Sequence, residues 1–276
     1  MLEILKAIFF GIVQGITEWL PISSTGHMIL LDEFIHLDVS EDFMELFEVL
    51  IQLGSIIAVL VVYFTKLNPF SPKKTPKEKK STWHMWVCVI AGVIPSAVAG
   101  ILLDDWFNEH FYNWYTVAAT LIIYGIAFIV IERLNRGREY KINSPEDIDI
   151  KTALLIGCFQ VLAIIPGTSR SGSTIIGAML LGTSRTAAAE FSFFMAIPTM
   201  LGASLLKGVK ILAIDGLAVT ANEWLLLAVA SVVAFLVSLA VIKFLVGFVR
   251  RHSFSSFGVY RIILGAAVII YFALVS

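Results

Sequence analysis

Long apolar runs alternate with short polar stretches along the whole chain. Six of the runs are long enough to cross a bilayer, which takes about 20 consecutive apolar residues in a helix. They cover residues 46–64, 85–103, 115–132, 188–206, 224–248 and 258–275. The pattern therefore predicts six transmembrane helices, three in each half of the chain.

Two further apolar segments are each broken at a proline. Residues 4–20 are near the lower length limit for a span, are interrupted by Glu18 and stop at Pro21, and residues 157–174 break at Pro166. In both, an apolar half-helix is followed by a Ser/Thr/Gly turn and a second apolar run. Placed one on the other, the segments match Gly11 with Gly157, Gln14 with Gln160, Ser23 with Ser169, Thr25 with Ser171 and Gly26 with Gly172. The prolines miss by one position, so the repeat is partial.

The charged residues of the loops predict the orientation. Lys and Arg gather in 65–84, 133–151 and 249–257, whereas 28–45 and 104–114 carry acids and no Lys or Arg. Loops rich in Lys and Arg remain in the cytoplasm, so the first three loops are predicted inside and the last two outside. Counting the crossings then puts both ends of the second broken segment on the cytoplasmic side. That segment is predicted to be re-entrant.

The first broken segment completes the predicted fold. If residues 4–45 form a matching hairpin from outside, each half is one re-entrant helical hairpin plus three transmembrane helices. Three crossings is an odd number, so the halves, approximately 1–135 and 150–276, would be inverted copies joined by a cytoplasmic linker. Irregular backbone at membrane depth is allowed where it lines a polar cavity, as in inverted-repeat proteins. The alternative is that residues 4–22 span, which puts the N-terminus inside.

Composition agrees with a single all-α polytopic membrane domain over residues 1–276. Apolar residues make up 58% and charged residues 15%, with a mean hydropathy of +0.87. The net charge of −1 comes without any basic domain, so nucleic acid is not an expected partner. Cys88 and Cys158 lie in apolar segments and fit neither a disulfide nor a metal pattern. The N-terminus is interpreted as mature protein, because Glu18 and the SSTGH turn follow where a signal cleavage site should be.

Charged residues in the apolar segments predict where the site lies. Each costs about 2.5–3.5 kcal/mol at a helix centre even on the lenient insertion scale, so Arg170, Glu18, Glu48 and Glu190 should face each other or a polar ligand. For Glu48 and Glu190, internal ion pairs are an equal alternative. Arg170 lies in PGTSRSGST, a hydroxyl- and glycine-rich turn opening a helix near Thr174. Backbone N–H groups of such a turn form an anion nest, and the arginine fork binds phosphate oxygens bidentately.

The first turn offers complementary chemistry. Ser24 and His27 are three residues apart, so on one helix they share a face, and the serine could attack phosphorus while the histidine takes its proton. Gln14 and Glu18 are four apart and supply oxygen ligands suited to Mg²⁺ or Ca²⁺. Simpler interpretations are helix capping for Ser23 and Thr25 and an interfacial role for His27. The combination of carboxylate, serine, histidine and nested arginine favours phosphoryl transfer.

Four stretches of the chain resemble the sequences of a known family. QGITEWLPISSTGH and PGTSRSGST closely resemble the two signature motifs of the undecaprenyl-diphosphatase family, and FEVLIQLGSIIAVL and EFSFFMAIP are also similar to it. The resemblance implies hydrolysis of undecaprenyl diphosphate to undecaprenyl phosphate and inorganic phosphate, which recycles the lipid carrier for peptidoglycan and confers bacitracin resistance. It also implies a divalent metal ion, the bacterial inner membrane, and an active site open to the periplasmic or outer face.

The same resemblance assigns roles to residues of the two motifs. The expected catalytic residues are Glu18, Ser24, His27 and Arg170. The expected substrate-binding residues are Ser23, Thr25, Ser169, Ser171, Gly172, Ser173 and Thr174, and the expected metal ligands are Glu18 and Gln14. Position 14 is Gln where many relatives have Glu, which leaves Glu18 as the surer ligand or base. Ser24 with His27 as its base is the first choice of nucleophile; His27 itself and a metal-activated water stay open.

Three other classes of protein compete with a lipid diphosphatase. A transporter or lipid flippase shares the inverted-repeat plan, and phosphate release by the purified protein separates the two. A type-2 phosphatidic acid phosphatase would need a Lys…Arg-Pro motif and a later His with an Asp, which the sequence lacks. A purely structural membrane scaffold does not account for Arg170 and Glu18 inside apolar segments. A homodimer is left open.

Overall fold

The protein is described from a computed structural model that covers residues 1–214 and 216–275, without the side chains of residues 104, 105, 108 and 275. Within these residues it is helical and contains no β-strand. The α-helices are α1 (Leu2–Thr17), α2 (Ser24–Phe34), α3 (Glu41–Val62), α4 (Phe64–Leu67), α5 (Pro76–Phe111), α6 (Trp114–Leu134), α7 (Ile150–Val161), α8 (Arg170–Leu180), α9 (Arg185–Val209), α10 (Ala221–Val249) and α11 (Ser255–Val275).

Among the described residues, six helices are long and apolar enough to cross a membrane. They comprise Glu41–Val62, Pro76–Leu103, Trp114–Leu134, Arg185–Ile214, Ala221–Val249 and Ser255–Leu274. Each overlaps one of the six predicted spans over nearly its whole length, three before the linker and three after it. The prediction of an all-α polytopic membrane protein is therefore confirmed.

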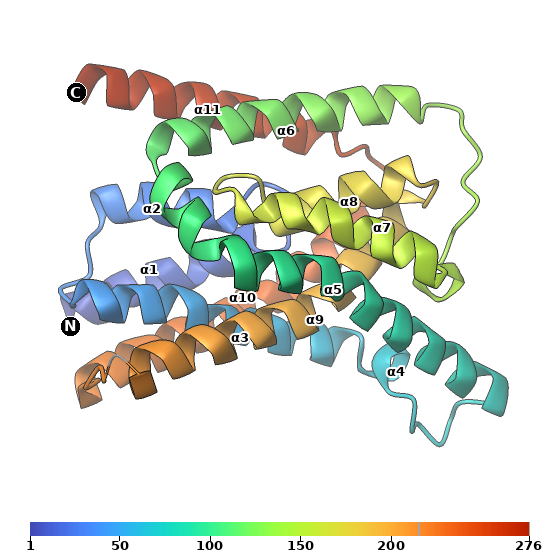
Figure 1. The fold of residues 1–276 in the computed structure, drawn as a ribbon, viewed down its shortest axis with the longest axis horizontal. Coiled ribbons are helices and arrows are strands. Elements are labelled where there is room, and N and C mark those ends of the chain that lie inside the picture. The colour runs from blue at the N-terminus through green and yellow to red at the C-terminus, as the bar shows by residue number, and fades with distance from the viewer. Residues whose placement is uncertain (215, 276) are drawn as a thin grey trace.

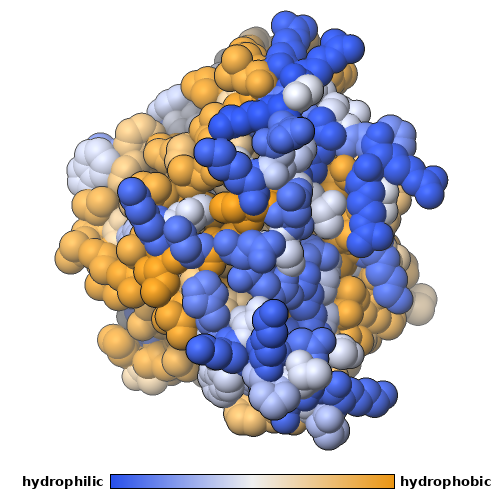
Figure 2. Space-filling view, turned by 90° about the vertical axis from the view of Figure 1, so that its right-hand side faces the viewer, coloured by the Kyte–Doolittle hydropathy of each residue, from blue (hydrophilic) through white to orange (hydrophobic). Residues whose placement is uncertain are grey.

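The long helices run roughly along the long axis of the molecule, and two pairs of short helices lie between them (Figure 1). The pair α1–α2 starts and finishes at the end that carries both chain termini. The pair α7–α8 starts and finishes at the opposite end, so the turns of the two pairs approach each other near the middle. That opposite end also gathers the basic loops, and Figure 2 shows it as a broad hydrophilic area bordered by apolar side chains.

Small residues set the packing of both short pairs. A Cβ added to Gly11 would lie 2.5 Å from the Ala230 carbonyl oxygen, so α1 packs backbone to backbone against α10. A Cβ added to Gly157 would lie 2.1 Å from the Gly92 carbonyl oxygen, so α7 packs in the same way against α5. Glycines allow such close approach between membrane helices. The matched glycines of the partial repeat thus hold each half-helix against a long helix from the other half of the chain.

Two ion pairs join α9 to neighbouring helices, one to α4 directly after α3 and one to α3 itself. Lys66, just after α3, lies 2.7 Å from buried Glu190 on α9, and Lys207 near the end of α9 lies 2.7 Å from Glu45 on α3. Of the two roles open for Glu190, the structure therefore supports the internal ion pair.

Candidate active site

The turns of the two short pairs adopt the same unusual backbone at matched residues. Ser23 precedes α2 with φ 75°, and Ser169 precedes α8 with φ 74°. Each serine Oγ accepts a hydrogen bond from the N–H three residues on, that of Gly26 at 3.2 Å and that of Gly172 at 3.1 Å. A positive φ is strained for a residue with a side chain, by about 1–3 kcal/mol, and such strain gathers at functional sites. Both serines are helix caps, as the simpler interpretation of Ser23 predicted.

These two helix starts are suited to anions. The first main-chain N–H groups of a helix have no partner within it, and the helix dipole places partial positive charge there. The turns before α2 and α8 come from opposite ends of the molecule and meet near its middle (Figure 1). Two such N-termini near one another match a ligand with two negatively charged groups.

Glu18 joins the two turns. Its Oε1 accepts a hydrogen bond from Arg170 Nη2 at 2.8 Å, and the two residues form an ion pair whose side chains are only 6% and 13% exposed. Its Oε2 accepts from Ser24 Oγ at 2.8 Å and from Gln14 Nε2 at 3.1 Å. The expectation that Arg170 and Glu18 face each other is confirmed, and the carboxylate contacts three of the predicted side chains.

Arg170 retains an unused donor. Its Nη1 donates to the Ser192 carbonyl oxygen at 3.0 Å, and its guanidinium lies 5.8 Å from the centre of a Trp19 ring. Its buried Nε has no hydrogen-bond partner among the described residues. Unpaired buried donors are rare in proteins, so this N–H is available to a ligand oxygen.

His27 does not bond Ser24, contrary to the sequence expectation. Its Nδ1 lies 2.7 Å from the Ser23 carbonyl oxygen and its Nε2 lies 2.7 Å from the Tyr260 hydroxyl. A carbonyl oxygen only accepts, so Nδ1 carries the proton and, in the neutral ring, Nε2 accepts from Tyr260. Shared helical spacing was correct, but both ring nitrogens are engaged elsewhere and Ser24 donates to Glu18 instead. Glu18 is therefore the nearest base for Ser24.

The other predicted binding residues divide by exposure. Thr25 is exposed, and Ser169 is partly exposed and bonded to Ser171 Oγ at 3.2 Å. Ser173 and Thr174 are fully buried, and Thr174 Oγ1 is 2.7 Å from Ser192 Oγ. Gly172 supplies the capping N–H of α8. The residues nearest the turn can meet a ligand, whereas the two buried hydroxyls pack behind it.

Two residues of α11 reach the site and were not predicted. Tyr260 bonds His27, and Arg261 is fully buried with its guanidinium on main-chain carbonyls of both turns. Arg261 is a lone charge in the apolar run 258–275. That was the available signal, because a charge at such a position needs a polar partner. Which partner it takes depends on the fold.

The donor set at Glu18 fits a divalent ion only with help from a ligand. One carboxylate, the Gln14 amide and the Ser24 hydroxyl lie together, and the described residues contain no group of three or more His, Cys, Asp or Glu that could hold a metal. Mg²⁺ is commonly bound by one or two carboxylates together with substrate phosphates. The residues therefore fit an ion shared with a phosphate ligand.

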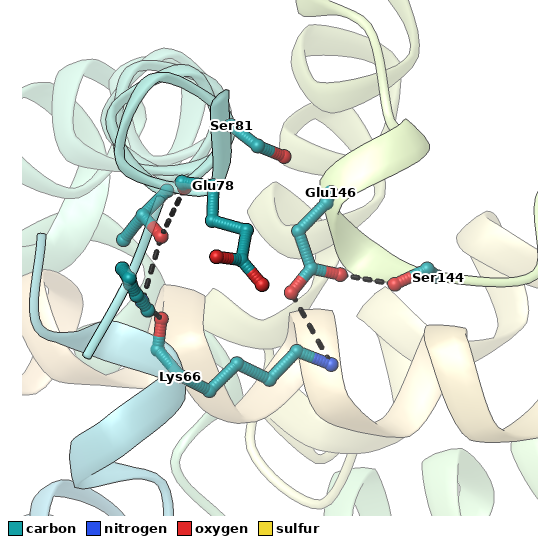
Figure 3. A pocket seen from close by; sticks show the side chains of 7 residues that line it. Lys66, Glu78, Ser81, Ser144 and Glu146 are labelled. Carbon is teal, nitrogen blue, oxygen red and sulfur yellow. Dashed lines mark hydrogen bonds and ion pairs between the residues drawn. The ribbon is translucent and has the colours of Figure 1, made fainter. Parts of the chain in front are cut away.

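A separate cavity of about 380 Å³ lies at the end with the basic loops and is lined by Lys66, Lys74, Glu78, Ser81, Thr82, Ser144 and Glu146 (Figure 3). The charged side chains that line it form ion pairs or hydrogen bonds with other residues of the protein. Lys66 reaches Glu146 at 3.5 Å as well as Glu190, and Lys74 donates to Thr82 Oγ1 at 2.8 Å. Partial burial lowers the pKa of the Lys74 ammonium group. None of the predicted site residues lines this cavity.

Comparisons with known proteins point in one direction. The family model described as bacitracin resistance protein BacA matches residues 7–267. A protein of Streptococcus suis (strain 05ZYH33) named undecaprenyl-diphosphatase is 55% identical over 271 residues, covering 98% of this chain and 97% of that protein. Proteins with the same name are 55% identical in Limosilactobacillus fermentum over 276 residues, 100% of both chains, and 56% identical in Enterococcus faecalis over 266 residues, 96% of both.

Proposed function

The chain belongs to the family of the bacitracin resistance protein BacA, and we propose that it is an undecaprenyl-diphosphate phosphatase. It hydrolyses undecaprenyl diphosphate to undecaprenyl phosphate and inorganic phosphate, recycling the lipid carrier for peptidoglycan synthesis and conferring resistance to bacitracin. The observation that carries this proposal is the contact of Glu18 with both Arg170 and Ser24. It unites an acid, a hydroxyl and an arginine from two turns, as phosphoryl transfer requires.

The diphosphate lies between the N-termini of α2 and α8 in this proposal. The main-chain N–H groups of each helix start receive one phosphate, and Arg170 neutralises charge with the guanidinium N–H groups that face the ligand. Dipoles and charges fixed in advance in a water-poor site stabilise a transition state strongly. Of the exposed and half-buried hydroxyls, Thr25 and Ser169 are placed to contact the phosphate oxygens.

Ser24 is the proposed nucleophile. Its Oγ attacks the terminal phosphorus, its proton passes to Glu18, and the bond from that phosphorus to the bridging oxygen breaks to release undecaprenyl phosphate. Water then attacks the phosphorus of the phosphoserine and breaks its bond to Ser24 Oγ, which releases inorganic phosphate, and Glu18 returns the proton to Ser24. The leaving group is itself a phosphate, so it departs without a strong general acid, and His27 serves to hold the Ser23 carbonyl and the turn.

A divalent metal ion is proposed at Glu18 and Gln14, shared with the substrate phosphates. When bound, it would neutralise charge on the diphosphate. The residues of the site bind and orient the diphosphate, and Glu18 accepts the proton from Ser24. Mg²⁺ or Ca²⁺ is the expected ion because the candidate ligands are all oxygens.

The proposed setting is the bacterial cell membrane, with the basic loops in the cytoplasm. The pairs α1–α2 and α7–α8 would then be re-entrant hairpins from opposite faces, and the two halves would form an inverted repeat. The site opens to the outer, periplasmic face, and the prenyl tail leaves sideways between long helices. Supporting this are the six apolar helices and the hydrophilic end that gathers the basic loops (Figure 2).

Phosphate release from undecaprenyl diphosphate by the purified protein tests the proposal. We expect activity that EDTA abolishes and added Mg²⁺ restores, with Ser24→Ala and Arg170→Lys each reduced about 100-fold or more. Arg170→Lys keeps the charge but loses the fork. Arg185→Lys is the matched control, since Arg185 pairs with Glu132 and has no part in the site. Wild-type protein without turnover on this substrate would refute the proposed function.

A further inference from the structure

Arg261 holds main-chain atoms of both turns with one side chain. Its Nη1 donates to the Pro21 carbonyl oxygen at 3.1 Å, in the turn before α2. Its Nη2 donates to the carbonyl oxygens of Gly167 at 2.8 Å and Thr168 at 3.0 Å, in the turn before α8. The side chain is fully buried. The two helix starts are therefore tied to a single rigid fork.

The fork is also fixed to the long helices. Nε and Nη2 reach carbonyl oxygens of α6, those of Leu121 and Thr120, both at 3.4 Å. Thr120 in turn donates its hydroxyl to the Pro166 carbonyl oxygen at 2.8 Å. Helices α6 and α11 lie side by side (Figure 1) and form the frame from which Arg261 extends.

No carboxylate neutralises this arginine within the described part of the chain. Arg261 forms no ion pair with any of the described residues, and its other close partner is the Tyr124 ring, 5.6 Å from the guanidinium carbon. A buried charge without a counter-ion is expensive, so carbonyl dipoles alone compensate it. The charge also lies next to the first turn of α8, where a Cβ on Gly172 would be 3.4 Å from Nη1.

The bonded carbonyls belong to the peptides of the anion-binding turn. The Thr168 carbonyl shares a peptide group with the N–H of Ser169, at the start of α8. Hydrogen bonds in series polarise one another, so a guanidinium on the carbonyl strengthens the N–H as a donor. A lysine could reach carbonyls of one turn, but its ammonium lacks the planar spread of the fork.

We propose that Arg261 is a positioning residue for the two-phosphate substrate: its guanidinium sets the spacing of the α2 and α8 N-termini so that one diphosphate bridges both. This rests on the proposed function for the identity of the substrate. The residue that sets the distance between the two N-termini then lies on α11, outside both signature turns. A ligand with a single phosphate needs one N-terminus and is indifferent to that spacing.

The test compares pyrophosphate with orthophosphate, using the full-length protein in detergent with Mg²⁺ and isothermal titration. For wild type we expect pyrophosphate to bind at least tenfold more tightly than orthophosphate. In Arg261→Lys the Kd for pyrophosphate should rise at least fivefold while that for orthophosphate stays within twofold. The kcat on undecaprenyl diphosphate should fall at least tenfold.

Two outcomes would overturn the proposal. One is an unchanged pyrophosphate affinity in Arg261→Lys; the other is an equal loss for both ligands, which indicates a general structural role. Thermal melts identify a variant that does not fold, and Arg261→Gln, which keeps one donor amide, then replaces it. If neither folds, a wild-type protein that binds pyrophosphate no better than orthophosphate refutes the proposal. Binding needs no turnover, so a failed phosphatase assay refutes the proposed function separately.

Discussion

Glu18 is the residue on which the two turns depend. It accepts hydrogen bonds from Gln14 and Ser24 of its own hairpin and from Arg170 of the other, and it is almost fully buried. Removing one partner of a buried ion pair leaves the other charge uncompensated, at about 3–5 kcal/mol. The carboxylate that is proposed to receive the Ser24 proton therefore also joins the two turns.

Glu18→Gln should impair both activity and stability. We expect phosphate release to fall about 100-fold or more, because Ser24 loses its base, and the melting temperature to fall because Arg170 loses its counter-ion. Glu45→Gln is the control, since Glu45 is in a half-exposed pair with Lys207 and such pairs contribute about 1 kcal/mol or less. Activity in Glu18→Gln within threefold of wild type would show that Glu18 is not the base.

At the scale of elements, two short helices start in the same strained way. Ser23 and Ser169 each combine a positive φ with a side-chain hydroxyl that caps the following helix. Glycine would relieve the strain and lose the cap, whereas alanine would keep the strain and lose the cap.

Ser169→Ala should therefore destabilise the protein more than Ser169→Gly. The expected difference is about 1 kcal/mol, from the strain that alanine retains. Thermal melts of the two variants in the same detergent measure it. Equal melting temperatures would mean that the positive φ carries no strain at this turn.

Glycine packing under α7 gives a second prediction at this scale. Gly157→Ala places a Cβ 2.1 Å from the Gly92 carbonyl oxygen, so α7 must move away from α5 and take the α8 turn with it. We expect a clear drop in melting temperature and at least a tenfold loss of activity. Gly202→Ala is the control, because nothing lies within 4 Å of its added Cβ and alanine favours a helix. A Gly157→Ala protein as stable as wild type would contradict the close packing of α7 on α5.

In the whole molecule, the first helix of each short pair packs on a long helix of the opposite half. α1 packs on α10 and α7 on α5, while ion pairs join α9 to α3 near one end and to α4 near the other. This exchange is what the proposed inverted repeat requires, with α1–α2 entering from the outer face. The proposed orientation puts Leu2 and Glu33 outside and Lys141 inside.

Cysteine labelling of intact cells tests that orientation. In a Cys158→Ser background, Leu2→Cys and Glu33→Cys should react with a membrane-impermeant maleimide, and Lys141→Cys should react only after the cells are opened; all three native positions are exposed and Cys88 is buried. Protection of Leu2→Cys with reaction of Glu33→Cys would favour the alternative in which residues 4–22 span the membrane.

Local pattern was enough to predict the six spans, the two breaks and the meeting of Arg170 with Glu18, because burying charge in apolar segments leaves few arrangements open. Helical spacing put Ser24 and His27 on one face, but it could not show that the Ser23 carbonyl and Tyr260 take both ring nitrogens. The contacts of Arg261 were also beyond the local pattern. Its hydrogen bonds to carbonyl oxygens of both turns depend on where α11 packs, which only long-range packing determines.

Matched positions of the partial repeat carry different groups: Ser24 aligns with Arg170, and Glu18 aligns with Ile164. Neither half of the polypeptide thus contains all the reactive groups of the site. Two copies of the first half would lack Arg170, and two copies of the second would lack Glu18. Cutting the chain in the linker between α6 and α7 should accordingly give fragments that are inert when made singly. Made together in one cell, they should complement each other and restore turnover, since their contacts are exchanged across the cut.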